Sequence, residues 1–478
     1  MDVPQLPSEE SMQKTSLGIR GRLLKGIGAQ GFSQAVQIFI RLAEVPLLLT
    51  FWGTQLYGEW LMLSAIPAYL SIGDGGFATA ACREMTIRGC AGDKTGVRAV
   101  FQSTWLLLVA VSFAAGLLAF GFVQAAPLED WLGFSVMKGL EIKFILLLLV
   151  AHVLVSFQGG LLNGGFWVTG RYPIGMYFIA GTQLLEFLGL AAAVALGGGP
   201  VQAALGYLAG RLLGTGLMWL GQRQASPWLR HGVSHASFTE LRRLTAPAFA
   251  SLAFPLGNAL NIQGMRLVVG LSLGPAALAV FTSLRTLSRL VMQPGCIINR
   301  LIEPELALAF GDENTSLFQR LFARSCQLAL WGCLGVCFLV GPGAHWIFPA
   351  WTGGKIAMHW PTYNILLAGL LINSIWYTAL MVPYATNRHG RIAIFYSLVY
   401  GATAFGLGYI WAAGLGLSGA ALALLLAEAA MAVVVIQTSL RMTSMSMAQW
   451  VKTVLRPPLD LLGNAGLDFW KRITPVTE

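Results

Sequence analysis

The stretch MRLVVGLSLGPAALAVFTSLRTLSRLVMQPG, residues 265–295, contains two apolar runs that meet at Gly274-Pro275. Three arginines, Arg266, Arg285 and Arg289, interrupt these runs. A charge at the centre of a membrane helix costs about 2.5–3.5 kcal/mol even on the mildest scale. Arg285 and Arg289 are four residues apart and share one face of a helix. The stretch therefore predicts a helical hairpin that faces a polar interior. The alternative is that an arginine lies near a helix end and reaches the membrane surface.

The composition extends this membrane assignment to the whole chain. Of the 478 residues, 56% are hydrophobic and only 11% are charged, and the mean hydropathy is +0.66. A soluble domain carries about 25% charged residues. Apolar runs of ~18 residues or more, the length that crosses the hydrocarbon core of a bilayer, recur from end to end. We therefore predict an all-α polytopic membrane protein.

The apolar runs divide into twelve predicted transmembrane helices, at 26–50, 59–82, 99–124, 143–168, 173–196, 201–221, 246–270, 275–298, 324–348, 362–384, 391–413 and 417–439. Between and around them we expect five parts. These are a cytoplasmic N-terminal segment with an amphipathic helix (1–25), an N-lobe (26–221), a cytoplasmic linker (222–245), a C-lobe (246–440) and a cytoplasmic tail lying on the membrane surface (441–478).

Basic residues are distributed unevenly among the predicted loops. When the first residue of a span is counted with the loop before it, 23 of the 31 lysines and arginines fall before the first span or after even-numbered spans, three fall in the opposite loops and five fall within spans. Loops rich in Lys and Arg stay on the cytoplasmic side, so both termini are predicted to be cytoplasmic. Topology accounts for the net charge of +10, and we expect no nucleic-acid partner.

The two halves of the chain share an internal repeat. Four anchors recur in order at offsets of 221, 219, 220 and 217 residues, namely 51–54 with 272–275, 92–93 with 311–312, 170–171 with 390–391, and 199–205 with 416–422. Each half has an even number of predicted spans, so both halves insert the same way up. They are therefore predicted to form two six-helix lobes related by a pseudo-two-fold axis along the membrane normal.

Several motifs resemble those of a known family. They are RLAEVPLLL at 41–49, Tyr57-Gly58, LSIGDGG at 70–76, GRY at 170–172 and GLGLSGAALALLLAE at 414–428. In order and spacing they are similar to bacterial polysaccharide and O-antigen flippases of the multidrug/oligosaccharidyl-lipid/polysaccharide (MOP) exporter superfamily. One departure is that Met265 stands before Arg266, where the family often has an aspartate.

The resemblance implies a multi-pass protein of the bacterial inner membrane that works by alternating access. The implied substrate is an undecaprenyl-pyrophosphate-linked oligosaccharide, a unit of O-antigen, capsule or exopolysaccharide. The implied partners are this lipid-linked oligosaccharide, the membrane and proteins of polysaccharide polymerisation and assembly. No enzymatic activity and no cofactor are expected, although H⁺ or Na⁺ coupling is compatible with the family.

Four arginines within predicted spans are candidates for binding the pyrophosphate, namely Arg41, Arg266, Arg285 and Arg289. The planar guanidinium pairs with phosphate oxygens and keeps its charge when it is desolvated. Arg41 has an alternative role, because Glu44 lies three residues further along the same helix face and is a coupling or ion-pair candidate.

Other charges within spans are candidates for coupling or for contacts between lobes. Arg211 and Glu428 fall at equivalent repeat positions, at an offset of 217. They pair across the pseudo-two-fold, line equivalent walls of the two lobes, or each find a polar neighbour within their own lobe. Glu186 and Asp74 are candidate proton or sodium sites. Asp74 has the alternative role of capping the glycine-rich break at 73–76, and His152 is interpreted as a packing residue.

Two other functions compete with the flippase. A cation-coupled multidrug exporter of the same superfamily should have an acidic cavity, whereas arginines dominate here. A membrane glycosyl- or acyltransferase needs clustered Asp, Glu or His at a membrane face. The largest predicted outer loop, 125–142, has three acidic residues and no histidine, so no catalytic residue is assigned. The six cysteines lack metal-site spacing with histidine, and no metal site is predicted.

Overall fold

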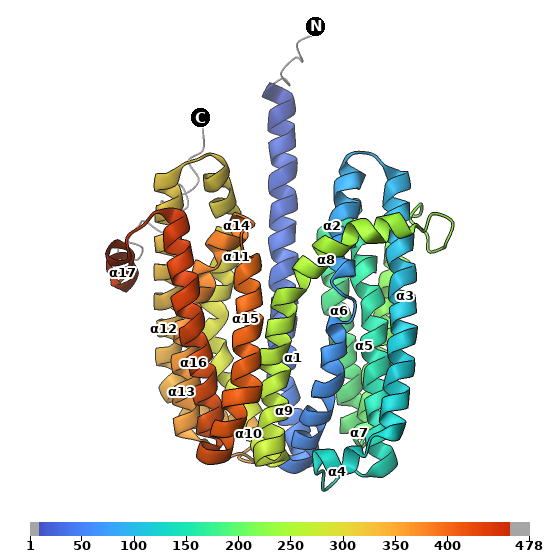
Figure 1. The fold of residues 1–478 in the computed structure, drawn as a ribbon, viewed down its shortest axis with the longest axis vertical. Coiled ribbons are helices and arrows are strands. Elements are labelled where there is room, and N and C mark those ends of the chain that lie inside the picture. The colour runs from blue at the N-terminus through green and yellow to red at the C-terminus, as the bar shows by residue number, and fades with distance from the viewer. Residues whose placement is uncertain (1–8, 459–478) are drawn as a thin grey trace. The chain divides into compact units, whose positions relative to one another are not determined.

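A computed structural model describes residues 9–458, and all regular elements in that range are helical (Figure 1). The chain divides into two compact units. Unit 1 comprises residues 1–53 and 63–252, and unit 2 comprises 54–62 and 253–478. The helices from the N-terminus to the unit boundary are α1 (Glu9–Ala68), η1 (Tyr69–Ile72), α2 (Phe77–Cys90), α3 (Lys94–Ala125), α4 (Leu128–Leu132), α5 (Gly139–Val168), α6 (Tyr172–Ala195), α7 (Pro200–Ala225) and α8 (Phe238–Ala259).

The boundary between the units falls within α8, between Leu252 and Ala253. The helices of unit 2 that follow are η2 (Leu260–Gly264), α9 (Met265–Leu273), α10 (Pro275–Ser288), η3 (Arg289–Met292), α11 (Gln293–Gly311), α12 (Thr315–Thr352), α13 (Trp360–Ala379), α14 (Met381–Ala385), α15 (Gly390–Ala402), η4 (Thr403–Gly408), α16 (Tyr409–Thr443) and α17 (Met447–Leu455).

The chain is a multi-pass membrane protein, as predicted. Within the described residues, seven helical stretches are long and apolar enough to cross a membrane. Two of them correspond to two predicted spans each: Gly28–Ile72 covers parts of 26–50 and 59–82, and Gly390–Thr443 contains both 391–413 and 417–439. The predicted spans 201–221, 246–270 and 275–298 are not among the seven, because amides, glycines and arginines dilute their apolar runs. The count of twelve spans therefore stays a prediction.

The repeat seen in the sequence has a counterpart in the backbone. Gly53 interrupts α1 with φ 72° and ψ −176°, and Gly274 separates α9 from α10 with φ 89° and ψ 165°. Both conformations favour glycine, and the offset is 274 − 53 = 221. The side chains of Asp93 and Asn314 each cap the helix that follows, again at an offset of 221. Asn314 lies two residues beyond the pair 311–312 that the sequence comparison matched to 92–93.

The N-terminal segment and the C-terminal tail are described only in part. Residues 11–25, for which we expected a separate surface helix, are continuous with α1. In the tail, α17 packs on α12, where Trp450 is buried and stacks on Phe322 at 6.2 Å between ring centroids. The side chain of Trp331 also donates to the carbonyl of Val454 at 3.2 Å. Residues 1–8 and 459–478 lie outside the described part.

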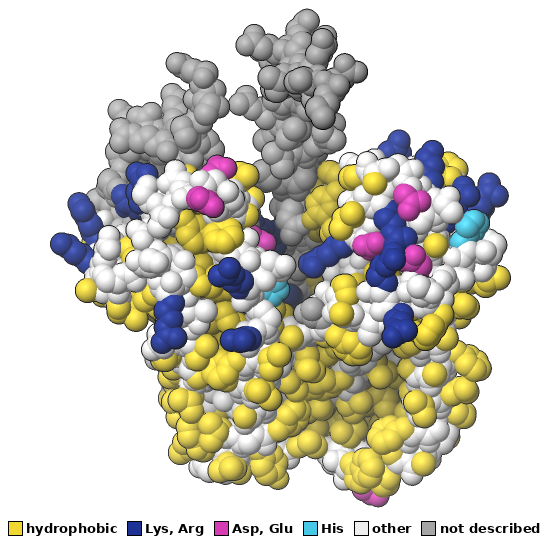
Figure 2. Space-filling model, turned by 45° about the horizontal axis from the view of Figure 1, so that its top comes forward, with side chains coloured by type: hydrophobic (Ala, Val, Ile, Leu, Met, Phe, Trp, Pro, Cys, Tyr) yellow, Lys and Arg dark blue, Asp and Glu magenta, His cyan; other side chains and the backbone are white. Residues whose placement is uncertain are grey.

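Basic residues gather at one end of unit 1, around the predicted linker (Figure 2). Arg88 at the end of α2 makes a two-point ion pair with Glu240, with distances of 2.7 and 3.2 Å. The Arg98 side chain donates to the carbonyl of Trp228 at 3.0 Å, and Gln102 contacts the backbone of Arg230 and of His235. The segment 222–245 is thus fixed against α2 by an ion pair and against α3 by side-chain to backbone bonds.

Glycines bring helices of unit 1 into close contact. A Cβ atom on Gly164 of α5 would lie 2.4 Å from Met85 of α2, which agrees with the close approach typical of the Gly160-x-x-x-Gly164 pair. A second series, Gly206, Gly210 and Gly214, lines α7 where it packs on α6, and the sequence analysis did not recognise it. Small residues there allow the two backbones to touch.

We expect Gly210→Ala to destabilise unit 1. The added Cβ would lie 2.4 Å from the Leu185 carbonyl oxygen and 2.6 Å from the Glu186 Cα, and these backbone atoms cannot move aside cheaply. Overpacking of this kind costs about 1–3 kcal/mol, which thermal unfolding of the purified protein would detect. Gly216→Ala in the same helix is the matched control, because nothing lies within 4 Å of its Cβ position. Equal melting temperatures for the two variants would contradict the expectation.

Candidate functional site

Unit 2 contains a cavity of about 410 Å³. It is lined from α8, η2, α10, η3, α11, α13, α14, α15 and α16, so that most helices of this unit contribute side chains. Its polar lining consists of Asn258, Asn261, Arg285, Ser288, Arg289, Asn373, Trp376, Tyr377, Tyr384, Tyr396 and Glu428. A cavity with this mixture of charges, amides and aromatic rings within an apolar helix bundle is the best candidate for a binding site.

Irregular helical turns position two of the lining residues. Asn261 lies in the π-helical turn η2, and Arg289 begins the 3₁₀ turn η3. A further π-helical turn, η4, follows Tyr400, which contacts Glu428 in the wall of the cavity. Such turns interrupt the regular hydrogen-bond pattern, and they are frequent at functional sites. The polar cavity and the breaks in the helices therefore coincide.

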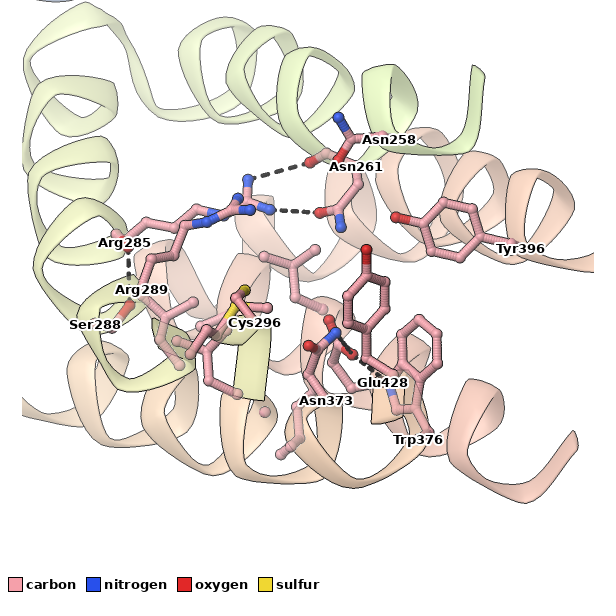
Figure 3. Close-up of a pocket in the computed structure, with 18 of the residues that line it drawn as sticks. Asn258, Asn261, Arg285, Ser288, Arg289, Cys296, Asn373, Trp376, Tyr396 and Glu428 are labelled. Carbon is pink, nitrogen blue, oxygen red and sulfur yellow. Dashed lines mark hydrogen bonds between the residues drawn. The ribbon is translucent and has the colours of Figure 1, made fainter. Parts of the chain in front are cut away.

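Two arginines form the cationic side of the cavity (Figure 3). The Arg285 guanidinium donates to the Asn261 carbonyl at 3.1 Å and also to the side-chain oxygen of Asn261, which fixes its orientation. Arg289 lies one turn further on, close enough for its charge to repel that of Arg285. Within the described part of the chain, no hydrogen bond or ion pair occupies the guanidinium of Arg289.

A single carboxylate lies in the opposite wall. Glu428 of α16 is only 7% exposed, and three neutral donors surround it. Asn373 and Trp376 each donate to Oε2 at 2.8 Å, and the Tyr400 hydroxyl donates to Oε1 at 2.6 Å. Three donors to a buried carboxylate compensate much of the cost of removing it from water.

We expect Tyr400→Phe to lower the free energy of unfolding by about 1.5–3 kcal/mol, since it removes a short hydrogen bond to a buried charge. Thermal or denaturant unfolding of the purified protein measures the change. Tyr363→Phe is the matched control, because Tyr363 is also fully buried but its hydroxyl makes only a 3.3 Å bond to the carbonyl of Val340. An equal loss of unfolding free energy in Tyr363→Phe would show that the hydrogen bond to Glu428 stabilises the protein no more than the bond to Val340 does.

Unit 1 has a polar cluster of its own between α5, α6 and α7. Arg211 Nε lies 2.5 Å from Glu186 Oε1 and 3.3 Å from His152 Nε2. The side chains of Arg211 and Glu186 are 19% and 4% exposed. The His152 ring also stacks on Tyr207, with 4.1 Å between ring centroids. His152, which we interpreted as a packing residue, is therefore also part of a buried ion-pair network.

The clusters of the two units occupy matching positions in the repeat with opposite charge. His152 and Asn373 differ by 221 residues, and Arg211 and Glu428 differ by 217. At this position unit 1 has the cation Arg211 on α7, which pairs with Glu186. Unit 2 has the anion Glu428 on α16, which accepts hydrogen bonds from neutral donors. Arg211 and Glu428 each have polar partners within their own unit, which is one of the alternatives that the sequence left open.

The remaining candidates lie elsewhere. Arg266 is outside the cavity lining, donates to Gln263 at 3.2 Å and is near enough to Arg285 for their charges to repel. Arg41 and Glu44 belong to α1 in unit 1. Asp74 accepts a hydrogen bond from the backbone N–H of Gly76 at 3.0 Å, so it stabilises the turn between η1 and α2.

Four residues that shape the cavity were not among the sequence candidates, namely Asn261, Asn373, Trp376 and Tyr400. Buried amides within predicted spans were the available signal, since an amide in hydrocarbon requires a partner. Among the described residues, no group of three or more His, Cys, Asp or Glu side chains is arranged to hold a metal ion.

The sequence matches no protein-family model and no curated protein. The fold, in contrast, is similar to several solved structures. The lipid II flippase MurJ in an inward closed conformation has a TM-score of 0.64 and 15% identity, with 93% of each chain covered. An inward-facing multidrug resistance MATE family transporter has a TM-score of 0.63 and 15% identity, over 85% of this chain and 98% of that one.

A third similar structure is a MOP superfamily transporter from Pyrococcus furiosus, described as having a binding pocket of reversed polarity. Its TM-score is 0.60 at 16% identity, and the match covers 88% of this chain and 95% of the other. The chain therefore has the fold of MOP superfamily transporters. This confirms the predicted fold class, an all-α polytopic membrane protein.

Proposed function

We propose that this chain is a flippase that moves an undecaprenyl-pyrophosphate-linked oligosaccharide across the bacterial inner membrane by alternating access. The cavity of unit 2 would receive the pyrophosphate on Arg285 and Arg289. The glycan would be a unit of O-antigen, capsule or exopolysaccharide, and the termini would be cytoplasmic. Proteins that polymerise and assemble the polysaccharide would act next on the product.

The proposal rests mainly on the guanidinium N–H donors of Arg289, which have no hydrogen-bond acceptor among the described residues. A guanidinium has five N–H donors and cannot lose its proton in a protein. In the described part of unit 2 these donors have no acceptor, while the neighbouring Arg285 is held in place by Asn261. Two adjacent cations at the wall of a membrane cavity are costly unless an anion joins them. A pyrophosphate supplies that anion, and its oxygens match the fork of each guanidinium.

Other charges would support this site. Arg266 would add positive potential beside Arg285, and Arg41 would offer a cationic group within unit 1. Glu428 and the Glu186–Arg211 pair are the candidates for coupling to H⁺ or Na⁺, because each is a buried carboxylate with defined partners. Asp74 and Glu44 complete the set of acidic coupling candidates.

Gene deletion in the host tests the proposal. We expect the deletion strain to lose surface polysaccharide and to accumulate lipid-linked oligosaccharide, and a variant with both Arg285→Ala and Arg289→Ala to fail to restore it at matched membrane expression. Arg320→Ala is the control, since this exposed arginine bonds only to a carbonyl of its own helix, at 3.3 Å. Intact surface polysaccharide in the deletion strain, in a host without a second flippase, would favour cation-coupled multidrug export instead.

A further inference from the structure

A second pocket of about 310 Å³ adjoins the cationic cavity. Both are lined by Cys296, Tyr377 and Tyr384, so the two pockets are adjacent within unit 2. Beyond these shared residues, the second pocket is lined by Asn299 and Glu303 of α11 together with Arg300. The combined volume therefore runs from Arg289 along α11 toward its C-terminal half.

Packing within the described residues does not explain why the polar side chain of Asn299 is buried. It is 5% exposed, and neither its Oδ1 nor its Nδ2 has a hydrogen-bond partner among the described residues. Leaving a buried amide without partners costs free energy of about 1–3 kcal/mol per group. A ligand in this pocket that offers both a donor and an acceptor would satisfy the two atoms.

The two tyrosines connect the ends of the combined volume. Tyr377 is 38% exposed, lines both pockets, and lies close enough to Arg289, Glu303 and Arg300 for their charges to act on its phenol. The Tyr384 ring stacks on His389 and packs against Phe254, at centroid distances of 4.4 and 5.2 Å, and these three rings form one aromatic cluster. Rigid amphipathic rings of this kind offer an apolar face together with a polar edge.

A pyranose has matching chemistry. Its C–H face packs on an aromatic ring, and each hydroxyl both donates and accepts, so that it can satisfy an amide and a carboxylate together. A lipid tail would leave the Asn299 atoms unpaired. A second phosphate could pair with Arg300, but it would face the negative charge of Glu303 and has no donor for the Oδ1 of Asn299. Of these ligands, only a sugar fits all three features of the pocket.

We propose that this pocket is a sugar subsite, which binds the monosaccharide attached directly to the pyrophosphate. The inference rests on the proposed function, because the pyrophosphate on Arg285 and Arg289 sets the position of that sugar. Tyr377 contacts the pyranose face, and Asn299 and Glu303 bond to its hydroxyls. The protein thereby distinguishes a carrier lipid that bears glycan from the bare carrier.

The test is the ratio of glycan-bearing to bare undecaprenyl pyrophosphate that copurifies with the protein from its host in polymer-bounded native membrane discs, measured by mass spectrometry. We expect Asn299→Leu to lower this ratio about tenfold, the effect of losing one or two hydrogen bonds. Asn163→Leu is the matched control, since Asn163 is a similarly buried asparagine in unit 1 with an unpaired Oδ1. If Asn299→Leu is not produced at normal levels, Glu303→Gln, which changes an exposed residue of the same pocket, replaces it in the measurement.

The outcomes separate this inference from the proposed function. Removal of both Arg285 and Arg289 should deplete glycan-bearing and bare lipid together and leave their ratio near that of the unmodified protein. An unchanged ratio in Asn299→Leu and Glu303→Gln, with both lipids still lost in the arginine variant, would overturn the sugar subsite alone. Absence of both lipids from the unmodified protein would overturn the flippase proposal together with the subsite.

Discussion

Arg289→Ala is expected to reduce the rate of lipid-linked oligosaccharide transport about 100-fold, which is the effect of losing roughly 3 kcal/mol of charge-assisted bonding to a phosphate group. The effect should be large because the unpaired Arg289 makes no bond that stabilises the empty protein, so its donors are available to the substrate. Proteoliposomes loaded with a lipid-linked oligosaccharide, and assayed by accessibility of the glycan to an added glycosidase, measure the rate.

Two further variants define the cause. Arg289→Lys keeps the charge but loses the planar fork, so we expect it to recover only part of the rate. Arg320→Ala removes an exposed arginine of α12 and should transport normally. Because Arg289 has no partner in the described part of the chain and its charge repels that of Arg285, its removal should not lower the melting temperature. A normal transport rate for Arg289→Ala would exclude this side chain from the substrate site.

Glu186→Ala should have the largest effect on stability, lowering the free energy of unfolding by about 3 kcal/mol or more. The substitution leaves the charge of Arg211 inside the helix bundle without its carboxylate, which lies 2.5 Å away. His152 cannot replace the carboxylate, because a neutral ring does not balance the charge of the guanidinium. Denaturant unfolding in a fixed detergent, or the shift in melting temperature, gives the loss.

A double variant distinguishes the loss of the pair from the loss of packing. Adding Arg211→Leu to Glu186→Ala removes the orphaned charge, so most of the lost stability should return. If the double variant is as unstable as Glu186→Ala alone, the loss of stability comes from the cavity that the side chain leaves, and the ion pair contributes little to the free energy of unfolding.

The sequence predicted the fold class because hydropathy over long runs depends on composition alone. The repeat was also visible, since Gly53 and Gly274 require a backbone conformation that few other residues adopt. The match of 92–93 with 311–312 was two residues off, because a cap is made by Asp93 in one half and by Asn314 in the other. A pattern based on residue identity does not recognise that Asp and Asn have the same capping role.

The candidate site was predicted only in part. Arg285 and Arg289 were identified from their charge, because a charge in a span always needs an explanation. The partners of these charges come from helices more than twenty residues away, as with Asn261 for Arg285 and Asn373 for Glu428. The rotation of each helix decides these contacts, and hydropathy does not specify it.

The sequence by itself determined that the chain is an all-helical membrane protein with a duplicated architecture and with arginines in its spans. Length, hydropathy and the spacing of special residues along one chain are sufficient for those conclusions. Only the tertiary structure decided that Arg285 and Arg289 share a cavity, that Arg266 lies outside its lining, and that Arg211 and Glu428 each have partners in their own unit. These contacts depend on helix rotation and on π and 3₁₀ turns, which arise from packing among helices distant in the sequence.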